Sequence, residues 1–170
     1  MAGKFNKIRK AKDVSNTTEV RSYETLVVLV LLYGSECWRL RKEDERKILT
    51  AEMTWLRKIL HVMRSDRIKN IDIREILQQK ETVADKIRRR RLTWLDHVSR
   101  TDKRRLPSKA MYCYIKGRRK RGGPPKKWID NIKEDVKLME LSIAYAEAVN
   151  LTRDREKWRS LVATSSSANG

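Results

Sequence analysis

Apolar residues recur along most of this chain with the three-to-four-residue spacing of an α-helix. Around Leu49, the side chains of Met53, Leu56, Leu60 and Met63 fall within about 40° of one helix face when each residue turns the helix by about 100°. The same period returns in the C-terminal half, and sheet-rich architectures fit the pattern poorly. The pattern therefore predicts a mostly α protein built from one or more small helical bundles.

Residues typical of helix starts divide this pattern into separate helices. Thr82 and Asp85 have the spacing of a capping box, although Asp replaces the usual Glu, and this helix is expected to run to about Arg100. A turn is expected over residues 103–109. The other predicted helix starts are Thr17 or Thr18, Glu43 (with an end near Met63), Asn70, Pro125, Ser142 and Thr152.

Two short stretches need separate interpretation. Leu26–Tyr33 contains eight consecutive apolar residues, whereas a membrane-spanning helix needs about 20, so we expect a buried helix end that is apolar on all sides and no membrane partner. A role at a membrane surface is the alternative for this stretch. Residues 110–115 are β-prone, and a short strand, an extended segment or a helical turn fits them equally well.

We expect four segments along the chain. They are a basic flexible N-terminus (1–18), a helical segment (19–80), a basic helical segment (81–163) that contains a Gly/Pro loop at 116–127, and a disordered tail (164–170). The oligomeric state is left open by the sequence.

Positive charge is concentrated in one of these segments. Of the 41 Lys and Arg residues, 17 lie between Lys86 and Lys127, where the acids are Asp96 and Asp102. This stretch carries +15 of the formal net charge of +19. Such a local excess of positive charge indicates a polyanionic partner, and nucleic acid, RNA or DNA, is the expected one. A solvated charge run without a partner is the alternative.

Four consecutive arginines, Arg88–Arg91, cannot share one face of a helix, because their directions span about 300°. The helical phase places Arg91 among apolar residues, and Arg88 and Arg89 outward. For Arg91 three interpretations stay open: an apolar stem with its head at the core edge, a buried ion pair for which Glu52 is a candidate, and a phosphate contact.

The loop resembles a flexible basic hook whose cations reach phosphates. The expected phosphate contacts are Arg88, Arg89, Arg118, Arg119, Lys120, Arg121, Lys126 and Lys127. Tyr112 and Tyr114 lie between basic clusters and are candidates for base stacking, whereas the helical spacing of Trp55, Trp94, Trp128 and Trp158 predicts core packing. Basic residues form one block on each side of the Gly and Pro residues of this loop, and two such blocks are as typical of a nuclear import signal as of phosphate binding. With no secretory pattern at the N-terminus, we expect an intracellular protein, with the nucleus favoured over the cytoplasm.

Catalytic and metal-binding patterns are weak. Asp130, Glu134 and Asp135 have ordinary helix-surface spacing, and they do not form the close carboxylate set that a polymerase or two-metal nuclease requires. The Cys and His residues lack the short spacings of structural zinc sites, and no nucleotide-binding glycine loop is present. We therefore expect a protein that is not an enzyme and that has no cofactor and no metal site.

Several motifs resemble the region that follows the catalytic palm in reverse transcriptases of non-LTR (LINE-type) retrotransposons. They are LLYGSECW (31–38), MTWLRKIL (53–60), IRRRRLTWLDHVSR (87–100), LPSKAMY (106–112), RGGPPKKWIDNIKEDV (121–136) and DREKWRSLV (154–162). The resemblance covers roughly residues 19–162. Departures from the family pattern are Cys37 in place of Thr, Asp96 in place of Gly and Gly123 in place of Arg.

The resemblance implies a thumb and connection region that holds template and primer, without the palm aspartates that perform synthesis. Gly123 replaces the Arg that would enter a groove, so phosphate contact is expected rather than base reading. The resemblance therefore implies a non-catalytic nucleic-acid-binding module. The alternatives are one part of an active RNA-directed DNA polymerase whose palm lies elsewhere, and a non-functional retroelement relic.

Overall fold

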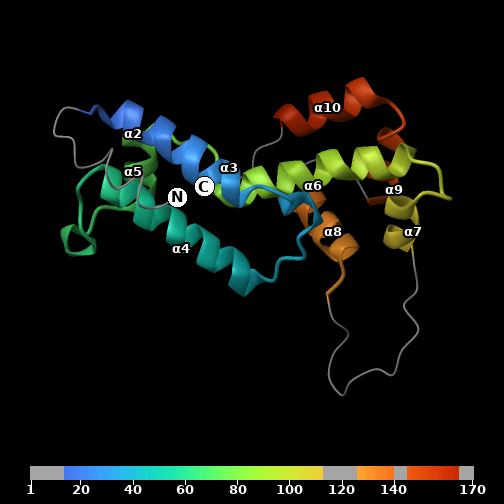
Figure 1. Ribbon diagram of the computed structural model, residues 1–170, viewed down its shortest axis with the longest axis horizontal. Helices are drawn as coiled ribbons and strands as arrows, with labels where there is room; N and C mark the ends of the chain where they lie inside the picture. Colours follow the sequence, from blue (N-terminus) through green and yellow to red (C-terminus); the bar gives the residue numbers. More distant parts are fainter. Residues whose placement is uncertain (1–13, 113–125, 140–144, 165–170) are drawn as a thin grey trace, which may run out of the picture. The chain divides into compact units, whose positions relative to one another are not determined.

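The computed structural model of the protein describes residues 14–112, 126–139 and 145–164 (Figure 1). All regular elements in these ranges are helices, as the hydrophobic period predicts. The described residues divide into two compact units: the first unit contains 14–35 and 42–87, and the second unit contains 36–41 and the described part of 88–164. No helix in these ranges is both long enough and apolar enough to span a bilayer.

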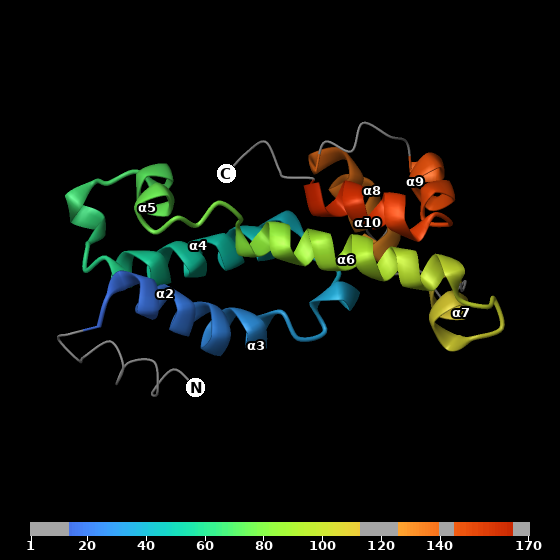
Figure 2. The same ribbon diagram turned by 90° about the horizontal axis from the view of Figure 1, so that it is seen from above.

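In the first unit, α2 (Asn16–Tyr23), a π-helical turn η1 (Glu24–Val28) and α3 (Leu29–Leu31) follow one another without a break. Figures 1 and 2 show this continuous helix lying along α4 (Lys42–Ile59). The α2 helix begins two or three residues earlier than predicted, because the Ser15 side chain accepts the N–H of Thr18 at 3.3 Å and caps the helix.

The exposed apolar residues of α3 correct one expectation. Leu29 and Val30 are 54% and 52% exposed, and Tyr33 is 87% exposed, although this stretch was expected to be buried on all sides. Only one side of the helix packs against the rest of the first unit, and Val28 and Leu32 are buried there. A short apolar run is therefore not evidence of a fully enclosed helix here.

The α4 helix ends before its apolar stripe does. Its last residue is Ile59, and His61 has a left-handed backbone with φ of 55°. Met63 consequently lies outside the helix and is 72% exposed. The chain continues through η3 (Arg64–Asp66) to α5 (Asn70–Ile76), whose N-cap is Lys69. Asn70 is thus the first helical residue, and its side chain accepts a hydrogen bond from Arg57 at 2.7 Å.

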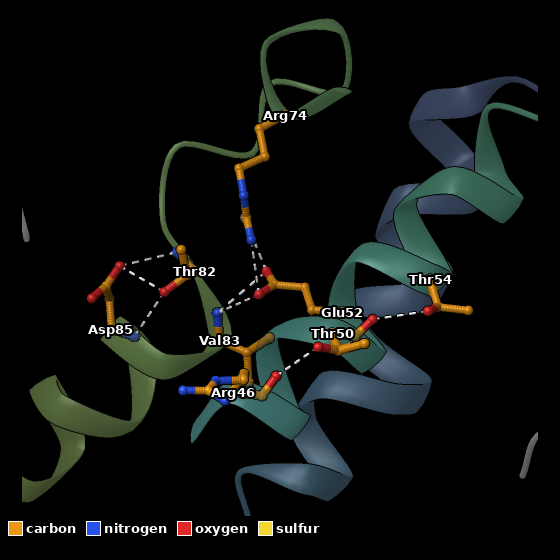
Figure 3. Close-up of polar contacts among 8 residues, drawn as sticks. All are labelled: Arg46, Thr50, Glu52, Thr54, Arg74, Thr82, Val83 and Asp85. Carbon is orange, nitrogen blue, oxygen red and sulfur yellow. Dashed lines mark hydrogen bonds and ion pairs between the residues drawn. The ribbon is translucent and has the colours of Figure 1, made fainter. Parts of the chain in front are cut away.

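Buried carboxylates organise the start of α6 (Val83–Arg100), as Figure 3 shows. Glu52 is 4% exposed, and its two oxygens accept the N–H of Val83 at 3.3 and 3.2 Å and the guanidinium of Arg74 at 3.1 and 3.0 Å. Thr82 and Asp85 form the predicted capping box, with reciprocal bonds of 3.3 and 3.1 Å. Negative groups at a helix N-terminus stabilise it, because its first N–H groups lack partners within the helix.

The second unit contains the rest of α6 and α7 (Leu106–Tyr112), α8 (Trp128–Leu138), α9 (Tyr145–Leu151) and α10 (Arg155–Thr164). Its core consists of Leu92, Leu95, Ile132, Val136, Met139, Ala148, Trp158 and Val162. The predicted turn at 103–109 is shorter than expected because α7 starts at Leu106, where Pro107 is tolerated in the first turn. The strand alternative is wrong for residues 110–112, which are helical; residues 113–115 lie outside the described ranges.

The last helix begins later than predicted. Thr152 is fully buried and donates its hydroxyl to the Val149 carbonyl at 2.7 Å, so it does not cap α10. Asp154 performs that role, because its side chain accepts the N–H of Lys157 at 3.2 Å. A hydrogen bond from Lys157 lowers the pKa of the Asp154 carboxyl, which keeps the capping group ionised. The predicted starts at Pro125 and Ser142 lie outside the described residues.

The tryptophans divide by burial. Trp158 is fully buried, and its indole N–H donates to the Leu92 carbonyl at 3.1 Å. Trp128 is half-buried and packs against the core of the second unit. Trp94 is also half-buried but lies outside that core, with its ring stacked on His97 at 4.9 Å between centroids. The expectation that Trp94 is a core residue is therefore wrong.

A segment from the N-terminal half belongs to the second unit. Residues 36–41 precede α4 in sequence, yet the carbonyl of Glu36 accepts the Trp128 indole N–H at 2.7 Å. The carbonyl of Leu40 accepts the Asn131 amide at 2.8 Å, and Arg39 donates to the Lys126 carbonyl at 2.8 Å. The units interleave along the chain, so the structure does not divide it at the expected position between residues 80 and 81.

The Glu52 carboxylate provides a test of the first unit. Glu52→Ala leaves the Arg74 guanidinium and the Val83 N–H without their acceptor, and we expect it to lower the free energy of unfolding by about 3 to 5 kcal/mol. Glu75→Ala, which removes an exposed carboxylate from α5, is the control and should change it by about 0.5 kcal/mol or less. Urea unfolding followed by circular dichroism measures both. Equal effects would show that Glu52 does not hold the start of α6.

Trp158 and Trp94 provide a matched pair in the second unit. Trp158→Ala should lower the free energy of unfolding by about 3 to 5 kcal/mol, because it empties the centre of the core. Trp94→Ala should lower it by about 1 kcal/mol, as an ordinary substitution does. Thermal and urea denaturation of the two variants tests this order, and a larger loss for Trp94→Ala would contradict the packing described above.

Candidate nucleic-acid interface

Arg91 is a buried structural arginine. It is 3% exposed, and its Nε and Nη2 donate to the two carboxylate oxygens of Asp135 on α8, each at 2.7 Å. The helical phase correctly predicted its inward direction, and the buried ion pair is the alternative that the structure shows. The suggested partner was wrong, because Glu52 is bound to Arg74 and Val83 in the first unit.

Arg88 lies beside the same carboxylate and does not project freely outward as expected. Its Nε is 3.9 Å from Asp135 Oδ1, and its side chain is 12% exposed. Burial lowers the pKa of Arg88 below its ordinary value, although the charge of Asp135 opposes this shift. Burial also raises the pKa of the Asp135 carboxyl, against the hydrogen bonds and charge of Arg91. Asp135 thus faces two guanidinium groups, and Arg88 is less accessible to a phosphate than its sequence position indicates.

The two remaining arginines of this run differ in exposure. Arg89 is half-buried, whereas the Arg90 side chain is 43% exposed and its Nη1 is 3.9 Å from Glu36 Oε2. Towards the end of α6, Asp96 is 2% exposed and binds Arg100 through bonds of 2.9 and 2.6 Å. Asp96 is therefore paired with a cation of the same helix.

The other expected contacts are only partly covered by the structure. Lys126 binds the Glu134 carboxylate, whereas Lys127 is exposed. Tyr112 is the last residue of α7. The expected contacts that lie outside the described residues are Arg118, Arg119, Lys120, Arg121 and Tyr114.

A cluster of exposed charge lies where the sequence predicted only a turn. Lys103, Arg104, Arg105 and Lys109 are all exposed, and none forms an ion pair with another described residue. We call these four residues, together with Leu106, the basic corner; it joins the end of α6 to α7 (Figures 1 and 2). The sequence contains a signal for this cluster: four cations lie within seven positions, and the adjacent acid is Asp102.

The geometry of the corner is held by Asp102. Its carboxylate accepts the backbone N–H of Arg104 at 2.8 Å, and its carbonyl accepts that of Arg105 at 2.9 Å. Ser108, one position after Pro107, is 3% exposed, so this side of α7 is covered by the protein. Asp102 therefore binds the backbone of the turn, and the cationic side chains of the corner are exposed to solvent.

Sites for small molecules or metals are less well supported. A hollow lined by Arg89, Asp96 and Trp158 has a volume of about 110 Å³, below the roughly 300 to 1,000 Å³ typical of ligand pockets. The described residues contain no group of three or more His, Cys, Asp and Glu side chains placed to hold a metal ion. Asp130 accepts the N–H of Lys127 at 2.7 Å, and Glu134 and Asp135 bind cations, so these α8 acids have structural partners.

Comparison of the chain with protein-family models, with curated proteins and with solved structures finds no match. The resemblance to retrotransposon polymerases therefore rests on the sequence motifs alone. A function for this protein has to be inferred from its charges, contacts and exposed side chains.

The Arg91–Asp135 ion pair allows a direct test of the helix phase. Arg91→Ala leaves Asp135 buried with an incomplete set of partners, and we expect it to lower the free energy of unfolding by about 3 to 5 kcal/mol. Arg90→Ala, on the same helix but exposed, should change it by about 1 kcal/mol or less. Urea unfolding measures both variants. Equal effects would mean that Arg90 and Arg91 do not differ in environment.

Proposed function

We propose that this protein is a non-catalytic nucleic-acid-binding module derived from the post-palm region of a non-LTR retrotransposon reverse transcriptase. The observation that carries the proposal is the concentration of positive charge: residues 86–127 have a net charge of +15 out of the total of +19. A field of this kind attracts polyanions and raises their association rate. The motif resemblance supports a nucleic acid as that polyanion.

The cations of this region differ in their contacts and exposure. Arg88, Arg91, Arg100 and Lys126 lie against carboxylates and contribute mainly to the fold. Lys127 and the cations of the basic corner are exposed and form no ion pair within the described ranges. We expect these, together with Arg118–Arg121 of the loop, to supply most phosphate contacts. Such contacts carry no base information, so binding should depend strongly on salt and weakly on sequence.

One experiment measures the proposal directly. Fluorescence titrations against RNA, single-stranded DNA and duplex DNA of equal length, each at several salt concentrations, give the affinity and its slope against log salt. We expect binding to all three, with a steep salt dependence. Absence of binding at low salt would overturn the proposed function. Differences among the three would identify the preferred nucleic acid.

A second candidate, one part of an active polymerase, is suggested by the motif resemblance, because the region that these motifs resemble follows the palm in non-LTR reverse transcriptases. We expect the isolated chain to show no RNA-directed synthesis. Primer extension with and without a palm-bearing fragment separates the two candidates. Stimulation of that fragment by this chain would favour the polymerase alternative over an independent binding module.

The loop cations provide a quantitative prediction. Replacing Arg118, Arg119, Lys120 and Arg121 by Ala should weaken binding to all sequences similarly. It should also flatten the slope of log affinity against log salt by about 0.9 for each duplex phosphate that the variant no longer neutralises. The control removes the same charge from exposed positions of the first unit. Its four substitutions are Lys47→Ala, Arg64→Ala, Lys69→Ala and Lys80→Ala. Equal slopes for the two variants would show that attraction is general and that the loop does not contact the backbone.

A further inference from the structure

Leu106, the first residue of α7, is an exposed apolar side chain within the basic corner. It is 82% exposed, more than any other large apolar residue described in the second unit, where Leu138 at 45% comes next. On the same short helix, Met111 packs against the core of that unit. One side of α7 therefore packs on the core, whereas Leu106 on the same helix is exposed to solvent.

The backbone around Leu106 is constrained on both sides. Asp102 holds the preceding turn through its bonds to the N–H groups of Arg104 and Arg105. Pro107 follows directly, and its ring restricts its own backbone φ angle to about −65°. The backbone of Leu106 is therefore restricted before binding, which reduces the backbone entropy lost when the side chain enters a contact.

We propose that the basic corner grips duplex nucleic acid and that Leu106 inserts as a wedge between adjacent base pairs. This inference rests on the proposed function and names its contact mode. Lys103, Arg104, Arg105 and Lys109 surround Leu106 in sequence and supply cations for the phosphates beside the insertion point. Apolar wedges of this kind partly unstack a base step and bend the duplex, which brings more backbone towards the cations.

The chemistry of the corner favours a nucleic acid over other polyanions. An acidic polysaccharide or an acidic protein segment offers charge without a stack of apolar surfaces into which a leucine fits. An anionic membrane offers both, but helices that bind at a membrane surface need a continuous apolar face. Among the α7 side chains whose burial the structure describes, Met111 packs on the protein core, Ser108 is buried, and Leu106 is the exposed large apolar one.

The wedge has a preferred target. Pyrimidine–purine steps such as TA unstack most easily, so the corner should bind best to duplexes that contain a central TA step. The selectivity would come from deformability and would need no hydrogen bond to a base edge. A modest preference for flexible steps is therefore expected, in addition to the strong salt dependence of phosphate contacts.

The test uses the full chain and a DNA duplex of about 20 base pairs, long enough to show a bend, with a central TA step that carries 2-aminopurine and end-attached fluorophores. Leu106→Ser removes the wedge without changing charge, and Leu138→Ser, at an exposed leucine of α8, is its control. Arg104→Gln with Arg105→Gln removes charge and keeps the wedge; Arg153→Gln with Arg155→Gln, at exposed positions of the same unit, is the charge control.

We expect the wild-type chain to raise 2-aminopurine fluorescence and to shorten the end-to-end distance. Leu106→Ser should abolish both changes and weaken affinity about tenfold, equivalent to about 1.4 kcal/mol, with an unchanged salt slope. The double arginine variant should flatten that slope by about 1.8. The Leu138 and Arg153/Arg155 variants should behave as wild type.

Failure of this inference is distinguishable from failure of the proposed function. If the wild-type chain binds the duplex and Leu106→Ser bends it equally well, the wedge is excluded and the binding module stands. Binding of the wild-type chain to vesicles of phosphatidylserine and phosphatidylcholine, abolished in Leu106→Ser while duplex binding is kept, would assign the corner to a membrane instead. If the wild-type chain binds no nucleic acid, both proposals fall.

Discussion

The second unit depends on the buried contact between Arg91 and Asp135. Two charged side chains, 3% and 2% exposed, meet in a bidentate pair that joins the middle of α6 to α8. A buried charge without its partner is strongly destabilising, so the register of these helices is defined by the pair even if its net contribution to stability is small. With α8 placed in this way, Trp128 and Asn131 bind the carbonyls of residues 36–41. One ion pair therefore positions both the helix with the four arginines and the segment that precedes α4.

The first unit also contains a buried charge with its partner, but here the central group is a carboxylate. Glu52 on α4 is the buried group, and it binds Arg74 of α5 together with the backbone N–H of Val83 (Figure 3). In both units a charge on an otherwise apolar helix face acquires a partner from a helix distant in sequence. The Tyr23 phenol is also buried in the first unit, which raises the pKa of its hydroxyl and keeps it neutral.

The difference between paired and exposed cations bears on function, because the cations of a basic protein are not equally able to bind a polyanion. Cations that face carboxylates, such as Arg88 and Lys126, have part of their field neutralised at short range. The basic corner has exposed side chains on a turn whose adjacent acid is engaged with the backbone. Its charge is therefore available at low desolvation penalty, and Leu106 adds an apolar group at the same place. The proposed interface is smaller than the basic segment and differs from the arginine run that dominates the sequence.

Local interactions made much of this protein predictable from its sequence alone. The helical period, the Thr82–Asp85 capping box and the inward direction of Arg91 all depend on residues a few positions apart, which interact in any helix of that sequence. The partner of Arg91, the exposure of Leu29 and Val30, and the placement of residues 36–41 were decided only by the tertiary structure. Glu52 and Asp135 are both acids on apolar helix faces, and nothing local distinguishes them as partners. The choice between them depends on which helices pack together, and that is a property of the whole fold.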